Sequence, residues 1–288
     1  MKQQIKSSLI LLLTATIWGV AFVAQSVGME YIGPFTFNAI RCVLGGMVLI
    51  PVILVLKKKK ETGAENQEKE DKKTLWMGGI ACGVILCIAS NLQQFGIMEA
   101  SVGKSGFFTA LYIVMIPVIG IFIGKRPGIK LWFCVALAVV GMYLLCMKDG
   151  SFTIERADIM LLLCALAFSF HILVVDYFSP KVDGVKMSCI QFFVCGVLSA
   201  VGMLFTETPD ISNIQAAWLP LLYAGLLSCG VGYTLQIVGQ KGINPVIASL
   251  IMSLESVISA LAGWVILGQV LSPKEILGCV LMFVAIII

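Results

Sequence analysis

Three ionisable residues stand inside long apolar stretches of the sequence, where a charge is costly unless it faces protein or water. Glu255 lies near the middle of its stretch, and Arg41 and His171 each lie about one helical turn from the centre of theirs. A carboxyl group there could exchange a proton or bind a cation, and a guanidinium could bind an anion. A histidine could relay protons, because its pKa lies nearest physiological pH.

Each of these residues also has a purely structural interpretation. Glu255 and Arg41 could form a buried ion pair that holds helices together. His171 could be a hydrogen-bonded packing residue. Gln93 near the outer end of the third stretch and Gln236 near the inner end of the eighth could line two entrances, or could bond from helix to helix.

Aromatic side chains could complete a cavity around these polar groups, although aromatic residues are also common against lipid. The candidates are Trp18, Tyr112 and Tyr233. The residues that we expect along a substrate or ion pathway are Glu255, Arg41, His171, Tyr112, Trp18, Gln93 and Gln236.

The elements that must position these residues are ten apolar stretches separated by short polar breaks. A bilayer core of about 30 Å requires about 20 apolar residues of helix. The sequence therefore predicts an all-α integral membrane protein, with ten spans at approximately 7–27, 34–56, 75–95, 101–123, 131–147, 157–178, 185–206, 217–238, 245–268 and 273–288.

Composition excludes a soluble domain of this length, because 59% of the residues are hydrophobic and only 12% are charged. All ten cysteines fall inside the expected spans without a CxxC pair, which favours packing over disulfides or metal binding. No nucleotide-binding, metalloprotease or nucleophile-elbow motif is present, so we expect no cofactor and no enzyme activity.

Positive charge indicates the orientation, because Lys and Arg accumulate on the cytoplasmic side. With the N-terminus inside, the inner segments hold fifteen Lys and Arg residues and the outer segments hold four. We therefore expect both termini in the cytoplasm, a solvated cytoplasmic loop at 57–74, and a location in the plasma or inner membrane. The net charge of +4 is explained by this topology and does not indicate nucleic-acid binding.

An internal repeat relates the two halves of the chain. A shift of 150 places Trp18 on Phe168 and Arg41 on Gln191, and a shift of 143 places Gln93 on Gln236. Small residues form a helical face in the fourth and ninth spans, again displaced by 143: Gly106, Ala110, Ile113, Pro117 and Gly120, then Ser249, Ser253, Ser256, Ala260 and Gly263.

These faces predict close helix packing deep in the bundle, because helices in lipid associate across small residues. Ala138, in the fifth span, is expected instead to tolerate a larger side chain. The expected repeats are 1–147 and 148–288, with five helices each. Because five is odd, the second repeat must be inverted, which is an architecture of secondary transporters. A duplicated structural protein would show the same symmetry.

Several motifs resemble those of the EamA-like permeases of the drug/metabolite transporter superfamily. They are Trp18-Gly19-Val20-Ala21-Phe22, Pro34 with Ala39-Ile40-Arg41, Gly106-Phe107-Phe108-Thr109-Ala110-Leu111-Tyr112 with Pro117, Gly124-Lys125-Arg126-Pro127, Phe170-His171-Ile172 with Asp176, and Leu254-Glu255-Ser256-Val257 with Gly268-Gln269. The resemblance implies ten helices in two inverted repeats, with helices 1–4 and 6–9 around a cavity and helices 5 and 10 peripheral. Many relatives have Glu-Pro and Gly-Glu where this chain has Glu255-Ser256 and Gly268-Gln269.

The charges limit the substrate, because Arg41 is the only deep cation and phosphorylated compounds need several. We therefore expect a transporter of a small neutral, zwitterionic or amphipathic metabolite, such as an amino acid or amine, with protons and lipids as the other partners and no need to oligomerise. The alternatives are a lipid-modifying enzyme, for which no cluster of catalytic residues is visible, and a channel, for which charged rings are missing.

Overall fold

The computed structural model describes residues 2–62, 71–122, 124, 128–146, 155–268 and 272–287, and within these ranges it contains helices and no strand. The helices are α1 (Lys2–Gly28), α2 (Pro34–Thr62), α3 (Lys72–Glu99), α4 (Val102–Ala110), α5 (Tyr112–Phe122), α6 (Ile129–Cys146), α7 (Arg156–Phe178), α8 (Gly184–Thr206), α9 (Ile211–Ala216), α10 (Trp218–Leu222), a π-helix (Tyr223–Tyr233), α11 (Thr234–Gln240), α12 (Pro245–Met252), α13 (Glu255–Leu267) and α14 (Pro273–Ile287).

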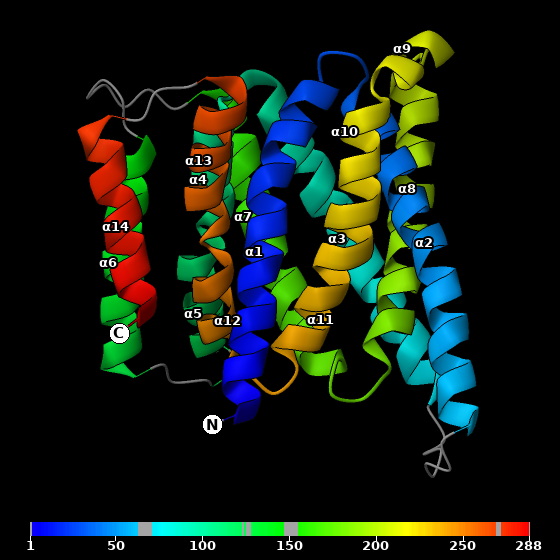
Figure 1. Cartoon of the computed structure of the whole chain (residues 1–288), viewed down its shortest axis with the longest axis horizontal. Helices are drawn as coiled ribbons and strands as arrows, with labels where there is room; N and C mark the ends of the chain where they lie inside the picture. Colours follow the sequence, from blue (N-terminus) through cyan, green and yellow to red (C-terminus); the bar gives the residue numbers. More distant parts are fainter. Residues whose placement is uncertain are drawn as a thin grey trace.

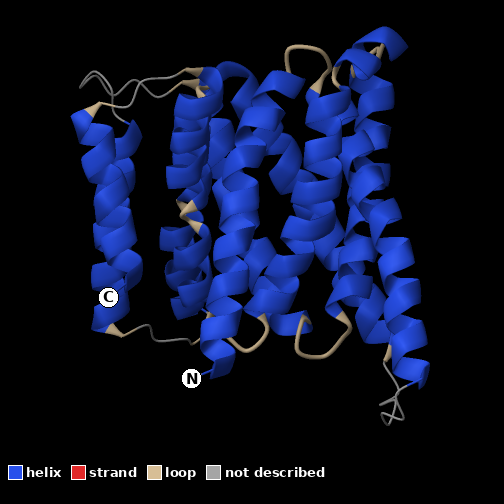
Figure 2. Ribbon diagram, in the orientation of Figure 1, coloured by secondary structure: helices blue, strands red, loops and turns tan. Residues whose placement is uncertain are grey.

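Eight segments of the described chain are long and apolar enough to cross a membrane, and two shorter apolar helices cover Ile129–Gly141 and Ile276–Ala285. The protein is therefore a multi-pass membrane protein. Its helices lie side by side and run between two opposite edges (Figures 1 and 2). This arrangement satisfies backbone hydrogen bonds within each helix, as the bilayer interior requires.

The expected loop at 57–74 is partly wrong. Helix α2 continues to Thr62, and Lys72 already belongs to α3, which Asp71 caps by accepting a hydrogen bond from the backbone N–H of Lys73. The lysines after the apolar part of α2 prolong the helix, because Lys is a good helix former and no breaker follows it at once. Residues 63–70, Lys125-Arg126-Pro127, Lys148 and Gln269 lie outside the described residues.

Helices α6 and α14 pack against each other at one side of the bundle (Figure 1). Their backbones approach closely, since a Cβ on Gly141 would lie 2.7 Å from the carbonyl oxygen of Gly278. Ala138 is only 1% exposed and belongs to the buried core. The expectation that Ala138 tolerates a larger side chain is therefore wrong. Ala138 lies on the buried face of α6, because a peripheral helix still buries the side that meets its neighbours.

Two spans are interrupted at the same relative place. Helix α4 ends and α5 begins around Leu111, whose N–H bonds to the carbonyl of Phe108 at 3.2 Å. Helix α12 ends and α13 begins around Ser253 and Leu254, where the N–H of Leu254 bonds to the carbonyl of Ile251 at 3.3 Å. Both bonds span three residues rather than four, so each span tightens locally. Leu111 and Leu254 are separated by 143 residues, the spacing of the repeat.

Serine side chains bond back to the backbone on both sides of the interruption in the second of these spans. Along α12 and α13, four hydroxyls donate to the carbonyl three residues earlier, at 2.7–2.8 Å: those of Ser249, Ser253, Ser256 and Ser259. Such bonds compete with the backbone ladder and bend helices. The small residues of the seam therefore do more than permit close packing.

The eighth span is not a uniform α-helix, because its central part Tyr223–Tyr233 is a π-helix. Glycines in it meet neighbouring helices closely: a Cβ on Gly225 would lie 2.8 Å from Leu44 Cβ, and one on Gly232 would lie 2.8 Å from Trp18 Nε1. π-Helical segments are rare and frequently lie at functional sites.

A polar cavity between the two halves as the candidate functional site

A cavity lies among helices of both halves and encloses about 420 Å³ of space outside the protein atoms, its open mouth included. The lining residues are Trp18, Ala21, Phe22, Gln25, Arg41, Gln93, Thr109, Tyr112, Phe168, Ile172, Ser228, Tyr233, Gln236 and Glu255. The cavity therefore contains six of the seven pathway residues expected from the sequence, and His171 is not in its lining.

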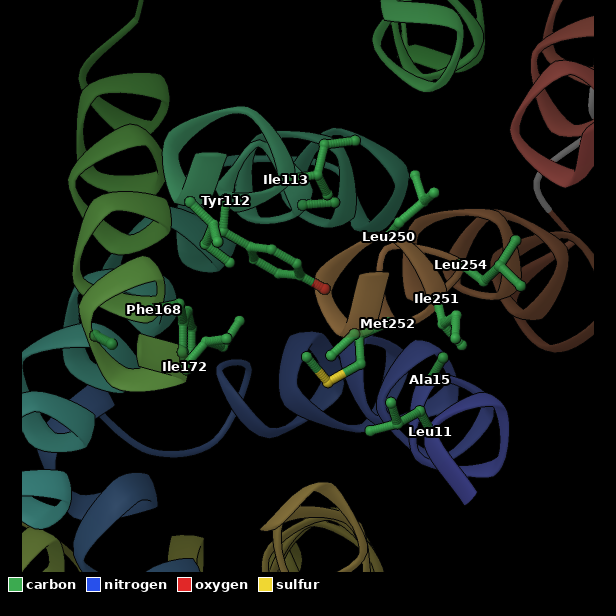
Figure 3. Packing of buried hydrophobic residues seen from close by; sticks show 14 of the residues in the cluster. Leu11, Ala15, Tyr112, Ile113, Phe168, Ile172, Leu250, Ile251, Met252 and Leu254 are labelled. Atoms are coloured by element: carbon green, nitrogen blue, oxygen red, sulfur yellow. The ribbon is translucent and has the colours of Figure 1, made fainter. Parts of the chain in front are cut away.

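Tyr112 and Glu255 meet at the cavity wall. The hydroxyl of Tyr112 donates to Oε1 of Glu255 at 2.9 Å, and both side chains are almost completely buried. Tyr112 begins α5 and Glu255 begins α13, so both stand directly after the interruptions of their spans. Figure 3 shows the Tyr112 hydroxyl pointing toward the helix pair α12–α13. A carboxyl group held by one phenol keeps its second oxygen available to a proton or to a ligand cation.

Arg41 is bound by Gln25 and not by Glu255. Its Nη1 donates to Oε1 of Gln25 at 2.8 Å, and its guanidinium carbon lies 5.6 Å from the centre of the Phe37 ring. Nε of Arg41 is buried and has no hydrogen-bond partner. Among the described residues no salt bridge joins Arg41 to Glu255, so the expected alternative of a buried ion pair is wrong. The two charges instead face one cavity.

His171 lies behind the cavity wall as a packing residue. Its Nε2 is 3.1 Å from Oε1 of Gln191, and its ring meets those of Phe168 and Tyr233 edge to face. The side chain is fully buried. The geometry agrees with the hydrogen-bonded packing interpretation, and it does not support a proton relay through the cavity.

Gln93 and Gln236 face the same cavity rather than two separate entrances. Nε2 of Gln93 donates to the hydroxyl of Thr109 at 3.4 Å, and Nε2 of Gln236 donates to Oε1 of Gln240 at 3.4 Å. The buried Oε1 of Gln236 has no partner. The expectation of two entrances is therefore corrected to one shared polar lining.

Aromatic rings form the apolar part of the wall. The rings of Trp18 and Tyr233 lie 4.6 Å apart, and the indole N–H of Trp18 donates to the carbonyl of Ser228 at 3.4 Å. Phe22 and Ile172 also line the cavity and were not selected from the sequence. The repeat could have found them, because they are 150 residues apart, as Trp18 and Phe168 are.

The small-residue seam lies inside the bundle. All ten of its members are buried, including Ala110, Pro117, Gly120, Ala260 and Gly263. A Cβ on Gly106 would lie 2.5 Å from Oγ of Ser259 and 3.3 Å from Cα of Ser256. The fourth and ninth spans therefore pack together through their small residues, next to the cavity.

Within the described ranges no three His, Cys, Asp or Glu side chains are arranged to hold a metal ion. The nine cysteines with described side chains are free thiols. The cavity offers polar groups and aromatic faces without a metal site, which suits binding of an organic molecule.

Comparison with known proteins identifies the family of this chain. The profile of the EamA-like transporter family matches residues 5–147 and 155–288. The chain belongs to the EamA-like transporter family. The family resemblance expected from the motifs is confirmed.

Relatives of this EamA-like transporter carry transporter names. An uncharacterized transporter of Archaeoglobus fulgidus is 27% identical over 279 residues, which are 96% of this chain and 83% of the relative. The uncharacterized transporter YwfM of Bacillus subtilis is 23% identical, over 98% of this chain and 92% of the relative. These similarities support a membrane transporter.

One solved structure shares the fold of this EamA-like transporter. A crystal structure with 17% sequence identity aligns with a TM-score of 0.77 over 98% of this chain and 95% of the other. The helical arrangement that surrounds the cavity is therefore the arrangement of a known fold.

Proposed function

We propose that the protein is a secondary transporter that moves a small zwitterionic or amphipathic metabolite through the central cavity by alternating access, with Glu255 exchanging protons. The hydrogen bond between Tyr112 and Glu255 carries this proposal. It joins residues at equivalent positions of the two halves, on the wall of the cavity that would bind the substrate.

Four pairs of cavity residues obey the repeat spacing. Trp18 and Phe168, and Phe22 and Ile172, are 150 residues apart, whereas Gln93 and Gln236, and Tyr112 and Glu255, are 143 apart. This pairing supports two repeats, 1–147 and 148–288, around a pseudo-twofold axis through the cavity. Ten membrane-crossing helices, five in each repeat, would make the repeats inverted. Interrupted helices beside a central site are a recurring feature of such transporters.

The cavity groups suit a zwitterion with an apolar part. The unpartnered Nε of Arg41 can donate to a carboxylate, and the Glu255 carboxylate can accept from an ammonium group. Aromatic faces such as those of Trp18 and Phe168 suit an apolar side chain or a cation. Arg41 is the one guanidinium of the cavity wall, which disfavours phosphorylated substrates.

Proton coupling is proposed for Glu255, because a carboxyl group enclosed in the bundle is costly in its ionised form unless it is solvated or paired. A site that opens alternately to two solutions would let this group gain a proton on one side and lose it on the other. We further propose that both termini are cytoplasmic and that the protein resides in the cell membrane. All the lining residues of the cavity come from one chain, which supports the proposal that no oligomer is needed.

Flux into proteoliposomes tests the proposal. Purified protein is reconstituted, and uptake of labelled amino acids, amines and neutral metabolites is followed with and without an imposed pH gradient. Saturable uptake that the gradient drives above equilibrium supports a proton-coupled carrier. Unsaturable passive flux would indicate a channel, and chemical conversion of a compound would indicate an enzyme. Arg41→Gln should weaken competition by compounds with a carboxylate more than competition by amines.

A further inference from the structure

Lys104 connects the two halves of the chain at one end of the bundle. It stands in the first turn of α4, and its Nζ lies 2.8 Å from Oε2 of Glu155 and 2.9 Å from Oδ1 of Asp158, at the start of α7. The Asp158 side chain is only 3% exposed, and its second oxygen accepts from the backbone N–H of Glu155 at 3.0 Å. The pair joins α4, whose Thr109 lines the cavity, to α7, whose Phe168 lines it also.

Glu207 makes a second connection between the halves. It follows α8, and its carboxylate accepts from the backbone N–H groups of Phe35 and Thr36 at 2.9 Å and from the Thr36 hydroxyl at 2.6 Å. These N–H groups belong to the first turn of α2, where an anion is stabilised. The repeat-equivalent helix α8 is capped by its own Asp183, and the position equivalent to Asp183 is Gly33.

Gly33 leaves room for this arrangement, because a Cβ there would overlap the Glu207 carboxylate in its present position. The first half therefore lacks a cap of its own, and the second half supplies one. The connection between α1 and α2 and the α8–α9 region lie at the edge of the bundle opposite the N-terminus (Figure 1). Alternation of the helices along the chain puts Lys104 and Glu155 at the same edge.

We propose that these two contacts, Lys104 with Glu155 and Asp158, and Glu207 with the start of α2, form a gate that closes the cavity at the end opposite the N-terminus. The inference rests on the proposed alternating access. Water can reach these contacts when the gate opens, because the Glu155 side chain is 59% exposed, that of Lys104 is 28% exposed, and Glu207 is partly exposed. The ion pairs of Lys104 and the hydrogen bonds of Glu207 both join different halves, so they hold only while those helix ends stay together.

Access to the cavity from each solution tests the gate without any substrate. Ala21 lines the cavity and is 1% exposed, so Ala21→Cys is a reporter of cavity access. Membrane-impermeant methanethiosulfonates, one cationic and one anionic, are added to the solution facing that end in oriented vesicles. Protein without the reporter gives the background from the native cysteines.

Lys104→Gln and Glu207→Gln are each expected to accelerate labelling by about fivefold, which corresponds to losing one modest ionic contact. In the double variant Lys104→Gln/Glu207→Gln the two factors should multiply, because the two contacts share no partner. Lys274→Gln and Asp210→Asn are the controls. Each removes a charge at the same end, and Asp210 bonds to Ser212 of its own half, so each should change the rate by less than about twofold. If Lys104→Gln does not fold, the double variant Lys104→Gln/Asp158→Asn replaces it, because this variant also removes the charge of the buried Asp158.

Each outcome decides for or against the gate. Acceleration with reagents of both signs, from that end only, supports it. Acceleration with the cationic reagent alone would mean that Lys104 merely repels the reagent, and the gate would be wrong. An unchanged labelling rate in a folded Lys104→Gln/Glu207→Gln variant also overturns the gate. So does acceleration of labelling only from the N-terminal side. Failure of every compound in the flux assay would leave these labelling rates unaffected, so the two proposals fail independently.

Discussion

The Tyr112 hydroxyl donates to Glu255 over 2.9 Å, and the two residues stand 143 positions apart, each directly after the interruption in its own span. One bond thus links equivalent points of two similar halves. Because a carboxyl group can change its charge and a phenol ordinarily does not, the two similar positions have become chemically different. A rearrangement of either interrupted span must change this bond, which makes it a natural connection between binding and movement.

Removing the Tyr112 hydroxyl should therefore be costly. In Tyr112→Phe the buried Glu255 loses its donor, and we expect the free energy of unfolding to fall by about 1–3 kcal/mol. Tyr143→Phe is the matched control, because Tyr143 is 48% exposed on the bundle surface and should be insensitive. Thermal unfolding of both variants in detergent measures the difference. Equal melting temperatures for the two variants would show that the bond adds no stability.

Gly106 tests the contact between the fourth and ninth spans at one atom. Gly106→Ala would put a methyl group 2.5 Å from Oγ of Ser259, so we expect destabilisation of about 1–3 kcal/mol from overpacking. Gly103→Ala, one turn earlier in α4, meets no heavy atom within 4 Å and should be neutral or slightly stabilising. A Gly106→Ala variant as stable as Gly103→Ala would argue against tight packing here.

Larger substitutions extend the same test along the seam. Ala110→Leu and Ser253→Leu place a larger side chain at fully buried positions. Each should lower the free energy of unfolding by about 1–3 kcal/mol or more, and so reduce the amount of folded protein. Ala136→Leu is the control on α6, where this alanine is exposed while Ala138 is buried. Size-exclusion profiles of membrane extracts give the folded fraction. If Ala136→Leu loses as much folded protein as the other two, bulk alone and not burial explains the effect.

Much of the helical framework could be predicted from the sequence, because the bilayer demands long apolar segments and leaves a strong signal of length and composition. The spacing of the repeat paired Gln93 with Gln236, but the sequence analysis assigned them to two entrances, whereas both line one cavity. What the sequence did not reveal depends on local competition. Hydroxyls bond back to carbonyls around the interruption at Ser253, but the same serines are equally compatible with a continuous helix.

The hydrogen-bond partners of the buried polar groups could not be predicted from the sequence either. Arg41 and Glu255 have opposite charges, so an ion pair was a reasonable hypothesis, yet Gln25 and Tyr112 bind them instead. Neutral partners with flexible side chains give no periodic signal. The orientation of Ala138 was missed for a related reason, because α6 is apolar on every side and its pattern does not separate lipid from protein.

The orientation of the chain remains a prediction that reporter fusions can check. Because the spans expected from the sequence put fifteen Lys and Arg residues on one side and four on the other, a reporter fused after position 65 or 183 should be cytoplasmic. A reporter after position 31 or 210 should be external. Alkaline phosphatase and green fluorescent protein respond oppositely to the two sides. An external signal from position 65 would reverse the orientation and, with it, the side on which the gate opens.

Glu255→Gln separates proton coupling from packing. Gln keeps the shape of the side chain and can still accept from Tyr112, but it cannot exchange a proton. We expect the variant to remain folded and to exchange substrate across the membrane, while losing accumulation driven by a pH gradient. Proteoliposome uptake with and without the gradient measures the two activities separately. Gln93→Glu serves as the converse control, because it adds a carboxyl group to the same cavity at a site that should not restore coupling. A well-folded Glu255→Gln protein that still concentrates substrate as the parent does would exclude Glu255 as the coupling group.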